Sequence, residues 1–176
     1  MRRVDLILGG CKSGKSSKAL SLAQSSRAEP KMYLATCQPR DEEMQDRVER
    51  HKQERGPEWL TIEEPLRIAE VIAERCQRER LLLVDCLTMW LSNLLIDDPS
   101  EGSIRARFDE LEQSLGRARG EVILVANEVG LGIVPESPLA RRFRDEAGLL
   151  NQHLGRIADR VLFMAGGFPV VLKGAL

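Results

Sequence analysis

The chain has 176 residues, which is enough for one domain with a substantial core. Hydrophobic residues make up 43% and charged residues 30%, and the net charge of −1 excludes an overall positive field that would attract nucleic acid or an anionic membrane. No apolar run approaches the roughly 20 residues of a membrane-spanning helix, and the apolar stretch that ends at Gly9-Gly10 is too short for a signal-peptide core. We therefore expect a cytoplasmic protein that neither binds nucleic acid nor inserts into a membrane.

Cysteine and histidine are too sparse for a structural zinc site. No C-x-x-C pair occurs and there are two histidines, so reduced thiols are the expected state of Cys11, Cys37, Cys76 and Cys86. Among the histidines, His153 lies amid the apolar residues of a predicted helix, and we interpret it as structural.

Short apolar runs alternate with helical patterns along the chain. The predicted strands are Val4–Leu8, Met32–Thr36, Leu81–Asp85, Val122–Asn127 and Val161–Ala165, with a short edge strand at Val170–Lys173. The predicted helices are Lys15–Ser26, Asp41–Arg55, Leu66–Arg78, Thr88–Leu95, Ile104–Arg117 and Pro138–Arg160. Nearly continuous apolar strands are typical of sheets covered on both faces. The alternation therefore predicts an α/β fold with a mostly parallel central sheet between two layers of helices.

Two connections are long enough to be loops. Residues 97–102 read as a surface excursion. Residues 130–137 directly follow a strand, and ligands of open α/β sheets bind beyond the carboxyl ends of strands, so this loop is a candidate wall of the site. The segment Asn127–Pro135 is too apolar for a solvated loop, which favours packing against a substrate or a neighbouring subunit.

A phosphate-binding loop is the clearest motif. It matches G-x-x-x-x-G-K-[ST] in full, between a buried strand and a helix, and consists of Gly9, Gly10, Cys11, Lys12, Ser13, Gly14, Lys15 and Ser16. Backbone N–H groups and the helix N-terminus would cradle phosphates, Lys15 would reach the β- and γ-phosphates, and the Ser16 hydroxyl would bind Mg²⁺. The alternative, a glycine-rich turn without a ligand, agrees less well with this context. We expect a P-loop NTPase (RecA-like) three-layer fold in a single catalytic domain, residues 1–176.

An acidic residue at the end of a neighbouring strand would complete the Mg²⁺ site. Asp85 follows four apolar residues, Leu81–Val84, and is the predicted second metal ligand. The alternative is that Asp85 caps the next helix.

His51 is the second histidine and lies in the predicted helix Asp41–Arg55. Met44 and Val48 fall on the same helical face as His51, so an apolar stripe carries the imidazole inward. Cationic neighbours would favour its neutral, nucleophilic form, and they are Arg47, Arg50, Lys52 and Arg55. From these residues alone a structural histidine is favoured over a catalytic one.

The chain resembles the adenosylcobinamide kinase/adenosylcobinamide-phosphate guanylyltransferase family of cobalamin biosynthesis nearly from end to end. The blocks that carry the resemblance are Gly9-Gly10-x-x-Ser13-Gly14-Lys15-Ser16, Tyr33-x-Ala35-Thr36, Asp41-x-Glu43-Met44-x-x-Arg47-Val48-x-x-His51-x-x-x-Arg55, Trp59, Asp85-Cys86-Leu87-Thr88-x-Trp90-Leu91-x-Asn93-Leu94-Leu95, Asn127-Glu128-Val129-Gly130-x-Gly132-Ile133-Val134-Pro135 and Arg144-Asp145-x-x-Gly148-x-x-Asn151-Gln152. The phosphate loop alone is widespread, whereas the later blocks in this order are specific. Cys11-Lys12 stands where the family often has a small residue and an arginine, and we expect little effect because backbone amides do the cradling.

The resemblance implies two reactions. The first phosphorylates the aminopropanol hydroxyl of adenosylcobinamide with ATP or GTP, and the second transfers GMP from GTP onto that phosphate through a GMP-histidine intermediate at the position of His51. It also implies that GTP is contacted by Thr36, Cys37, Gln38, Lys52, Gln53, Glu54, Arg55, Glu63 and Asp85. Family members are homotrimers, so a trimer is expected, with Asn127–Pro135 facing a neighbouring subunit.

Three rival functions stay open at this point. One is a plain small-molecule kinase that never uses His51. Another is a nucleotide-dependent DNA-binding motor of related fold, against which the charge balance and the short chain argue. The third is a nucleotide-sensing interaction module without turnover.

Overall fold

The computed structural model describes the whole chain except residues 1, 40–41, 43–44, 47–48, 50–54 and 57. The described residues form a seven-stranded sheet in the order β3-β2-β4-β5-β1-β6-β7. All neighbouring strands pair in parallel except β6 and β7, which pair antiparallel. The strands are β1 Arg3–Gly9, β2 Lys31–Ala35, β3 Leu60–Glu63, β4 Leu81–Asp85, β5 Glu121–Asn127, β6 Arg160–Ala165 and β7 Phe168–Lys173. The expected α/β fold with a mostly parallel sheet is confirmed.

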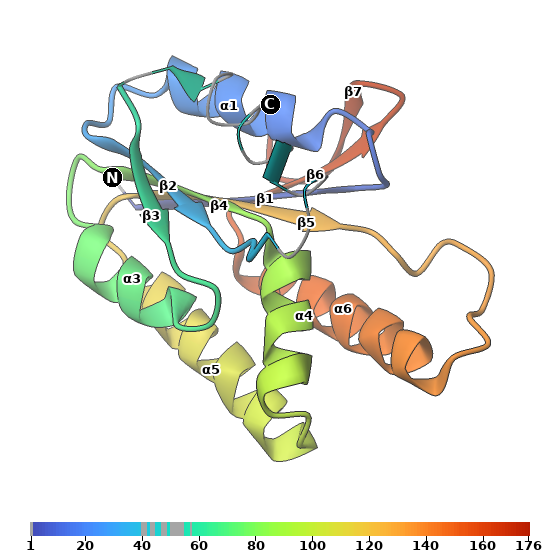
Figure 1. Ribbon diagram of the computed structural model, residues 1–176. Helices are drawn as coiled ribbons and strands as arrows, with labels where there is room; N and C mark the ends of the chain where they lie inside the picture. The colour runs from blue at the N-terminus through green and yellow to red at the C-terminus, as the bar shows by residue number, and fades with distance from the viewer. Residues whose placement is uncertain (1, 40–41, 43–44, 47–48, 50–54, 57) are drawn as a thin grey trace.

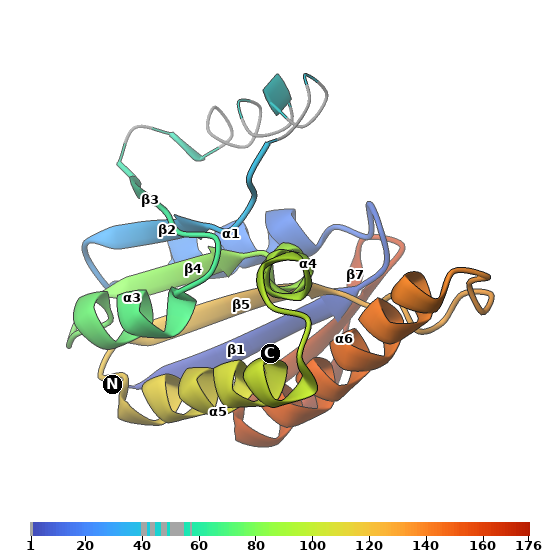
Figure 2. The same cartoon turned by 60° about the horizontal axis from the view of Figure 1, so that its bottom comes forward.

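Helices cover both faces of the sheet, which gives three layers (Figures 1 and 2). One face carries α1, and the other carries α3, α4, α5 and α6. The helices are α1 Lys15–Ser25, α3 Ile68–Arg75, α4 Leu87–Asp97, α5 Glu101–Arg117 and α6 Pro138–Ile157.

Two hydrophobic clusters, one on each face, follow from the alternation of side chains along each strand. On β4, Leu82 and Val84 join the cluster under α3–α6, whereas Leu81 and Leu83 join the cluster under α1. Both sets are buried, which explains why the strand sequence is apolar throughout.

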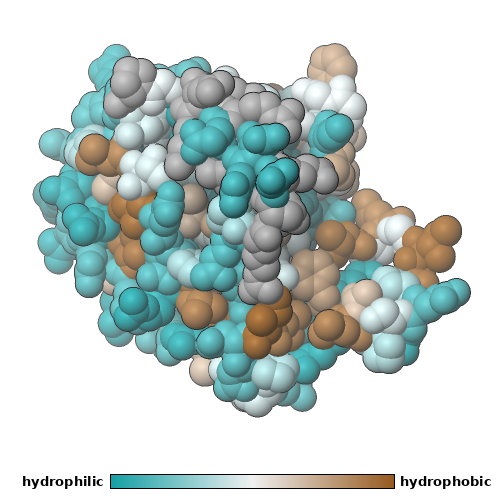
Figure 3. All heavy atoms as spheres, viewed as in Figure 1, coloured by the Kyte–Doolittle hydropathy of each residue, from teal (hydrophilic) through white to brown (hydrophobic). Residues whose placement is uncertain are grey.

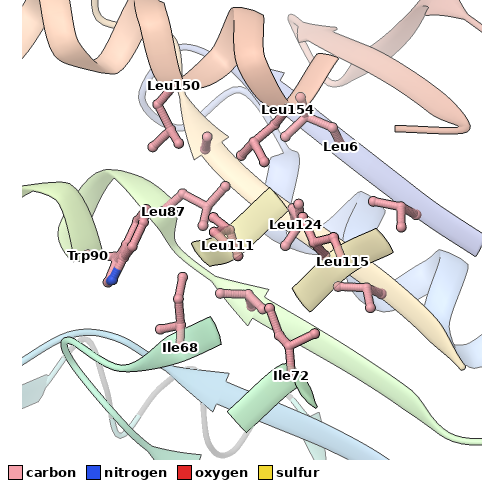
Figure 4. Packing of buried hydrophobic residues seen from close by; sticks show 14 of the residues in the cluster. Leu6, Ile68, Ile72, Leu87, Trp90, Leu111, Leu115, Leu124, Leu150 and Leu154 are labelled. Atoms are coloured by element: carbon pink, nitrogen blue, oxygen red, sulfur yellow. The ribbon is translucent and has the colours of Figure 1, made fainter. Parts of the chain in front are cut away.

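The larger cluster is built on amphipathic helices (Figure 4). On α5, the fully buried residues Phe108, Leu111 and Leu115 recur at helical spacing, and Leu154 packs from α6. Trp90 of α4 is also buried in this cluster, and its indole N–H donates to the Leu66 carbonyl over 2.8 Å. That bond lets a large aromatic side chain fill the core without leaving a buried donor unpaired.

A buried ion pair joins the central strand to the C-terminal part of the chain. Arg160 of β6 donates to both carboxylate oxygens of Asp5 on β1, over 3.1 and 2.7 Å, and both residues are 5% exposed. Asp5 and Arg160 are also register partners in the sheet. A bidentate pair of this kind is geometrically specific, because the guanidinium fork matches the carboxylate.

The structure corrects several predicted boundaries. The last predicted helix, Pro138–Arg160, ends at Ile157, because the Asp159 carboxylate and amide bond the backbone of Val4 and Arg160 begins β6. The predicted excursion 97–102 shrinks, because α4 extends through Asp97 and the Ser100 hydroxyl accepts from the Ser103 amide to cap α5 at Glu101.

The edge strand β3 was not predicted from the sequence. The helix predicted over Leu66–Arg78 corresponds to α3, which is shorter and spans Ile68–Arg75. The helix predicted over Asp41–Arg55 lies mostly outside the described residues.

The buried and exposed faces of α6 should differ in how much a substitution lowers the stability of the protein. Replacing the fully buried Leu154 with Ala should lower the free energy of unfolding by about 2–5 kcal/mol, because it removes buried methyl groups and leaves a cavity. Leu149→Ala on the exposed side of the same helix should change it by less than about 0.5 kcal/mol. Urea unfolding followed by circular dichroism measures both, and equal losses would contradict the assignment.

Candidate nucleotide-binding site

The loop between β1 and α1 has the backbone conformation that its glycines permit. Gly9 has φ +150°, and a Cβ there would lie 2.6 Å from the Met164 carbonyl oxygen. Gly14 has φ +95°, a left-handed conformation that side chains disfavour. The loop is tied to the C-terminal hairpin, because the Gly167 amide donates to the Ser13 carbonyl over 3.2 Å. Gly9 and Gly14 therefore both require glycine on steric grounds.

Lys15 lies within this loop, at the first position of α1. Its side chain is buried, and its ammonium donates to the Gly10 carbonyl over 2.6 Å and approaches the Ser13 hydroxyl at 3.5 Å. A buried cation beside a helix N-terminus gives the loop the electrostatics of an anion site. The predicted loop is therefore assembled with its lysine inside.

Ser16 and Asp85 meet in the structure. The Ser16 hydroxyl donates to a carboxylate oxygen of Asp85 over 3.1 Å, although 69 residues separate them. Adjacent oxygen ligands around an octahedral Mg²⁺ lie about 2.9 Å apart, given metal–oxygen bonds of about 2.1 Å. The two predicted metal ligands thus fit a divalent cation in identity and in spacing.

An aromatic–cationic cluster stands beside Asp85, and the residue at its centre is Tyr33. The Arg55 guanidinium lies 3.5 Å from the centroid of the Tyr33 ring, and the Trp59 ring is nearly perpendicular to that of Tyr33, with 6.4 Å between the ring centroids. Burial, and then the Asp85 carboxylate, raise the pKa of the Tyr33 hydroxyl well above its usual range. Arg55, predicted to contact GTP, is buried against Tyr33 in this structure. Residue patterns did not single out Tyr33 or Trp59; both entered the sequence analysis through the family blocks alone.

The end of β2 is fixed to the end of β4 through Thr36. Its hydroxyl donates to the Cys86 carbonyl over 2.7 Å and accepts from the Cys86 amide over 2.9 Å. Thr36 is fully buried and its own carbonyl accepts from Asn93, so the residue holds the frame of the site. Cys37 is half-buried and Gln38 is exposed on the segment that follows.

Glu63 ends β3 at the same edge of the sheet. It is the register partner of Ala35, which in turn pairs with Asp85. Predicted contact residues from three strands therefore share one edge. His51, Lys52, Gln53 and Glu54 lie outside the described residues.

The loop after β5 is anchored by residues to which sequence reasoning gave no individual role. The Glu128 amide donates to the Gly9 carbonyl over 2.9 Å, and its carboxylate accepts from Gly130 N–H and, over 3.3 Å, from Asn151. Thr88 accepts from the Asn127 amide over 2.7 Å. The signal was present in the sequence as polar residues at the carboxyl end of a strand, Asn127-Glu128.

Among the described residues, cysteines and His153 behave as expected. None of the four cysteines forms a disulfide, and burial followed by the Asp85 charge raises the pKa of the Cys86 thiol to about 11. His153 pairs with Glu112 across α5 and α6, in agreement with a structural role. In the described part of the chain, no helix has both the length and the apolar character needed to cross a bilayer.

Fold and loop together define a P-loop nucleotide-binding protein. Solved structures of similar fold include the type III secretion ATPase EscN of enteropathogenic Escherichia coli, with TM-score 0.64 and 14% identity over 98% of this chain and 47% of that one. A prototypical ATPase from the type III secretion system of pathogenic bacteria is also similar, with TM-score 0.55 and 15% identity over 99% of this chain and 57% of that one. At these identities the likeness concerns the fold.

The chain belongs to the cobinamide kinase / cobinamide phosphate guanyltransferase family, whose model matches residues 5–172. It is 46% identical to the bifunctional adenosylcobalamin biosynthesis protein CobP of Pseudomonas aeruginosa, over 97% of each chain. It is 39% identical to the bifunctional adenosylcobalamin biosynthesis protein CobU of Escherichia coli, over 96% of this chain and 98% of that one. The protein is thus a bifunctional enzyme of a kinase and guanylyltransferase family.

The environment of Tyr33 predicts its titration. It is the single tyrosine of the chain, so tyrosinate absorbance near 295 nm reports on it alone. Because the folded-state pKa is raised above the ordinary value of about 10, tyrosinate should appear only as the protein unfolds, and stability should fall as pH rises above about 10.

The control is Tyr33→Phe. It should show no such absorbance change and should lose less stability between pH 9 and 11. A reversible titration of the native protein with a midpoint near 10 would contradict the buried, protonated hydroxyl.

Proposed function

We propose that the protein phosphorylates adenosylcobinamide with ATP or GTP and then transfers GMP from GTP to the resulting phosphate. The products of the second step are adenosylcobinamide-GDP and pyrophosphate. The observation that carries the proposal is the match to the family over residues 5–172. The assembled phosphate loop, with Lys15 buried inside it, supports nucleotide chemistry at this place in the fold.

Ser16 and Asp85 are the proposed ligands of Mg²⁺. When bound, Mg²⁺ would neutralise charge on the phosphates of GTP or ATP. The Ser16 hydroxyl and the Asp85 carboxylate, 3.1 Å apart, supply the oxygen donors that this cation prefers. Thr36 and Cys86 keep the end of β4 beside β2, which holds the Asp85 carboxylate in place.

In the kinase step, Lys15 and the loop amides would bind the β- and γ-phosphates. The corrinoid hydroxyl attacks the γ-phosphorus, and the bond to the β-phosphate oxygen breaks as the nucleoside diphosphate leaves. Lys15 stabilises the negative charge that develops on the bridging and terminal oxygens. The proposed residues act by position and charge, because phosphoryl transfer asks little covalent chemistry of the protein.

In the guanylyl step, a neutral nitrogen of His51 would attack the α-phosphorus of GTP. Pyrophosphate leaves and a phosphorus–nitrogen bond forms. The phosphate of adenosylcobinamide phosphate then attacks the same phosphorus, and the phosphorus–nitrogen bond breaks to free the imidazole. We assign the remaining GTP contacts to Thr36, Cys37, Gln38, Lys52, Gln53, Glu54, Arg55, Glu63 and Asp85.

The two steps attack different phosphorus atoms. One nucleotide pose hardly presents both the γ-phosphorus to a hydroxyl and the α-phosphorus to an imidazole. We therefore propose two nucleotide poses, or a movement of the segment that carries His51, within one catalytic domain of residues 1–176.

We also propose a cytoplasmic homotrimer. The loop after β5 and the start of α6 expose Leu131, Ile133, Val134 and Leu139, which are between 59% and 96% accessible in the single chain. Figure 3 shows hydrophobic residues gathered where this loop protrudes from the body. Burial of such side chains against a neighbouring subunit would remove apolar surface from water.

Covalent labelling tests the role of His51. Incubation with α-labelled GTP and Mg²⁺ should label the native protein on histidine, with a bond that is acid-labile and base-stable. His51→Ala should lose the label and the guanylyl transfer while it keeps kinase turnover. The matched control is His153→Gln at the other histidine, which should label as the native protein does. Kinase activity without label in the native protein would leave a plain kinase as the function.

Removal of the shared phosphate site should impair both reactions. Lys15→Ala should lower kcat/KM at least a hundredfold for the kinase and for GMP labelling, because both steps use the same loop. Asp85→Asn should raise the Mg²⁺ concentration needed for half-maximal rate in both. Steady-state assays across a Mg²⁺ series measure this, and a loss confined to one reaction would show that the two steps do not share the loop.

A further inference from the structure

We propose that the protein has a second anion site, which takes diphosphate-type anions, in a cavity at the opposite edge of the sheet from the phosphate loop. The cavity has a volume of about 660 Å³ and is lined by Arg2, Arg78, Glu79, Ala118 and Arg119. Strand β1 runs for seven residues from Arg3, next to the cavity, to Gly9 in the loop, so the two places are about 20 Å apart. The proposal does not depend on His51 or on the order of the two reactions.

The three arginines come from three separate parts of the chain. Arg2 precedes β1, Arg78 lies between α3 and β4, and Arg119 lies between α5 and β5. Parallel strands begin at the same edge of the sheet, and this brings the three segments together. Figure 2 shows the N-terminus beside the end of α5, where the Arg2 side chain donates to the Leu115 carbonyl over 3.1 Å.

Backbone hydrogen bonds join the two connections that carry Arg78 and Arg119. The amides of Arg119 and Gly120 both donate to the Cys76 carbonyl, over 3.0 and 3.3 Å. A Cβ on Gly120 would lie 2.4 Å from the carbonyl oxygens of Gln77 and Arg80, so the two connections pack as closely as backbone allows. These contacts hold the backbone of the two connections together, with the side chains of Arg78 and Arg119 exposed.

The net charge of the cavity is positive when its arginines are weighed against Glu79 and the two helix C-termini nearby. Three guanidinium groups face one carboxylate, that of Glu79, and no ion pair with a described carboxylate is formed by any of the three. Two helices end here, and each contributes about −0.5 of an elementary charge. Arg75 and Arg117 stand in the last turns of α3 and α5 and offset those dipoles. Arg78 and Arg119 are therefore additional to the helix-capping arginines, whereas Arg2 also donates to the Leu115 carbonyl in the last turn of α5.

The chemistry of the guanidinium groups favours one class of ligand. Arginine binds phosphate oxygens in a bidentate fashion, and several arginines around one hollow favour an anion with adjacent phosphates. Inorganic pyrophosphate and the phosphate tail of a nucleotide share this chemistry. Pyrophosphate is also what the guanylyl step releases.

Equilibrium dialysis with labelled pyrophosphate at low ionic strength tests the site. The native chain should bind two equivalents, one in each site, and Lys15→Ala should bind one. Adding Arg78→Gln and Arg119→Gln to Lys15→Ala should weaken the remaining binding at least tenfold. The same pair of substitutions in the native chain should leave GMP labelling intact, which shows that the variant is folded and keeps its active site.

Arg117→Gln is the matched control, because it removes one charge from the same end of the molecule without lining the cavity. It should leave the second equivalent in place. Loss of all binding in Lys15→Ala, or equal weakening by Arg117→Gln, would overturn the site. Unlabelled GTP that competes for the second equivalent as well as pyrophosphate does would identify a nucleotide tail as an occupant. Orthophosphate that competes as well would overturn the assignment to adjacent phosphates.

Discussion

The site depends on one hydrogen bond that spans the sheet, from the Ser16 hydroxyl on α1 to the Asp85 carboxylate on β4. Strand β5 lies between β1 and β4, so these residues meet only if three strands keep their register. The pairings place Asp85 and Ile7 level with the same residue, Val125. From Ile7 the chain continues through Gly9 and turns back, and the first turn of α1 comes down beside Asp85. A slip of one residue would turn Asp85 to the other face of the sheet, so the apolar pattern of the strands also positions the polar site.

Further contacts near this hydrogen bond hold the Asp85 carboxylate in place. The Thr36 hydroxyl donates to the carbonyl of Cys86, the residue after Asp85. Tyr33 lies beside Asp85, and its ring is covered by the guanidinium of Arg55. Arg55 is also the described end of the segment that contains His51. The aromatic–cationic cluster therefore lies against the proposed metal ligand, and its Arg55 follows the proposed nucleophile by four residues in the sequence.

Much of this arrangement could be read from the sequence because it is local. The loop Gly9–Ser16 is a contiguous motif, and Asp85 stands out because a carboxylate ends an apolar strand. Pairings between distant residues could not be read. The sequence does not reveal that Arg160 pairs with Asp5. The predicted last helix therefore runs through Arg160, which in the structure begins β6. Likewise β3 has only four residues at the edge of the sheet, and it is a strand because it pairs with β2. The roles of His51 and its neighbours rest on the family resemblance.

The tie between the first strand and the last elements has a consequence for biosynthesis of the chain. Strand β1 is synthesised before the other strands of the sheet, yet its neighbours are β5 and β6, and 155 residues separate Asp5 from Arg160. The phosphate loop also contacts Gly167, whose amide donates a hydrogen bond to the Ser13 carbonyl. Contacts of such long sequence separation form late. During translation the nucleotide loop is therefore synthesised long before its site can form, and we expect a nascent chain to gain affinity for nucleotide only after β6 and Gly167 have been made.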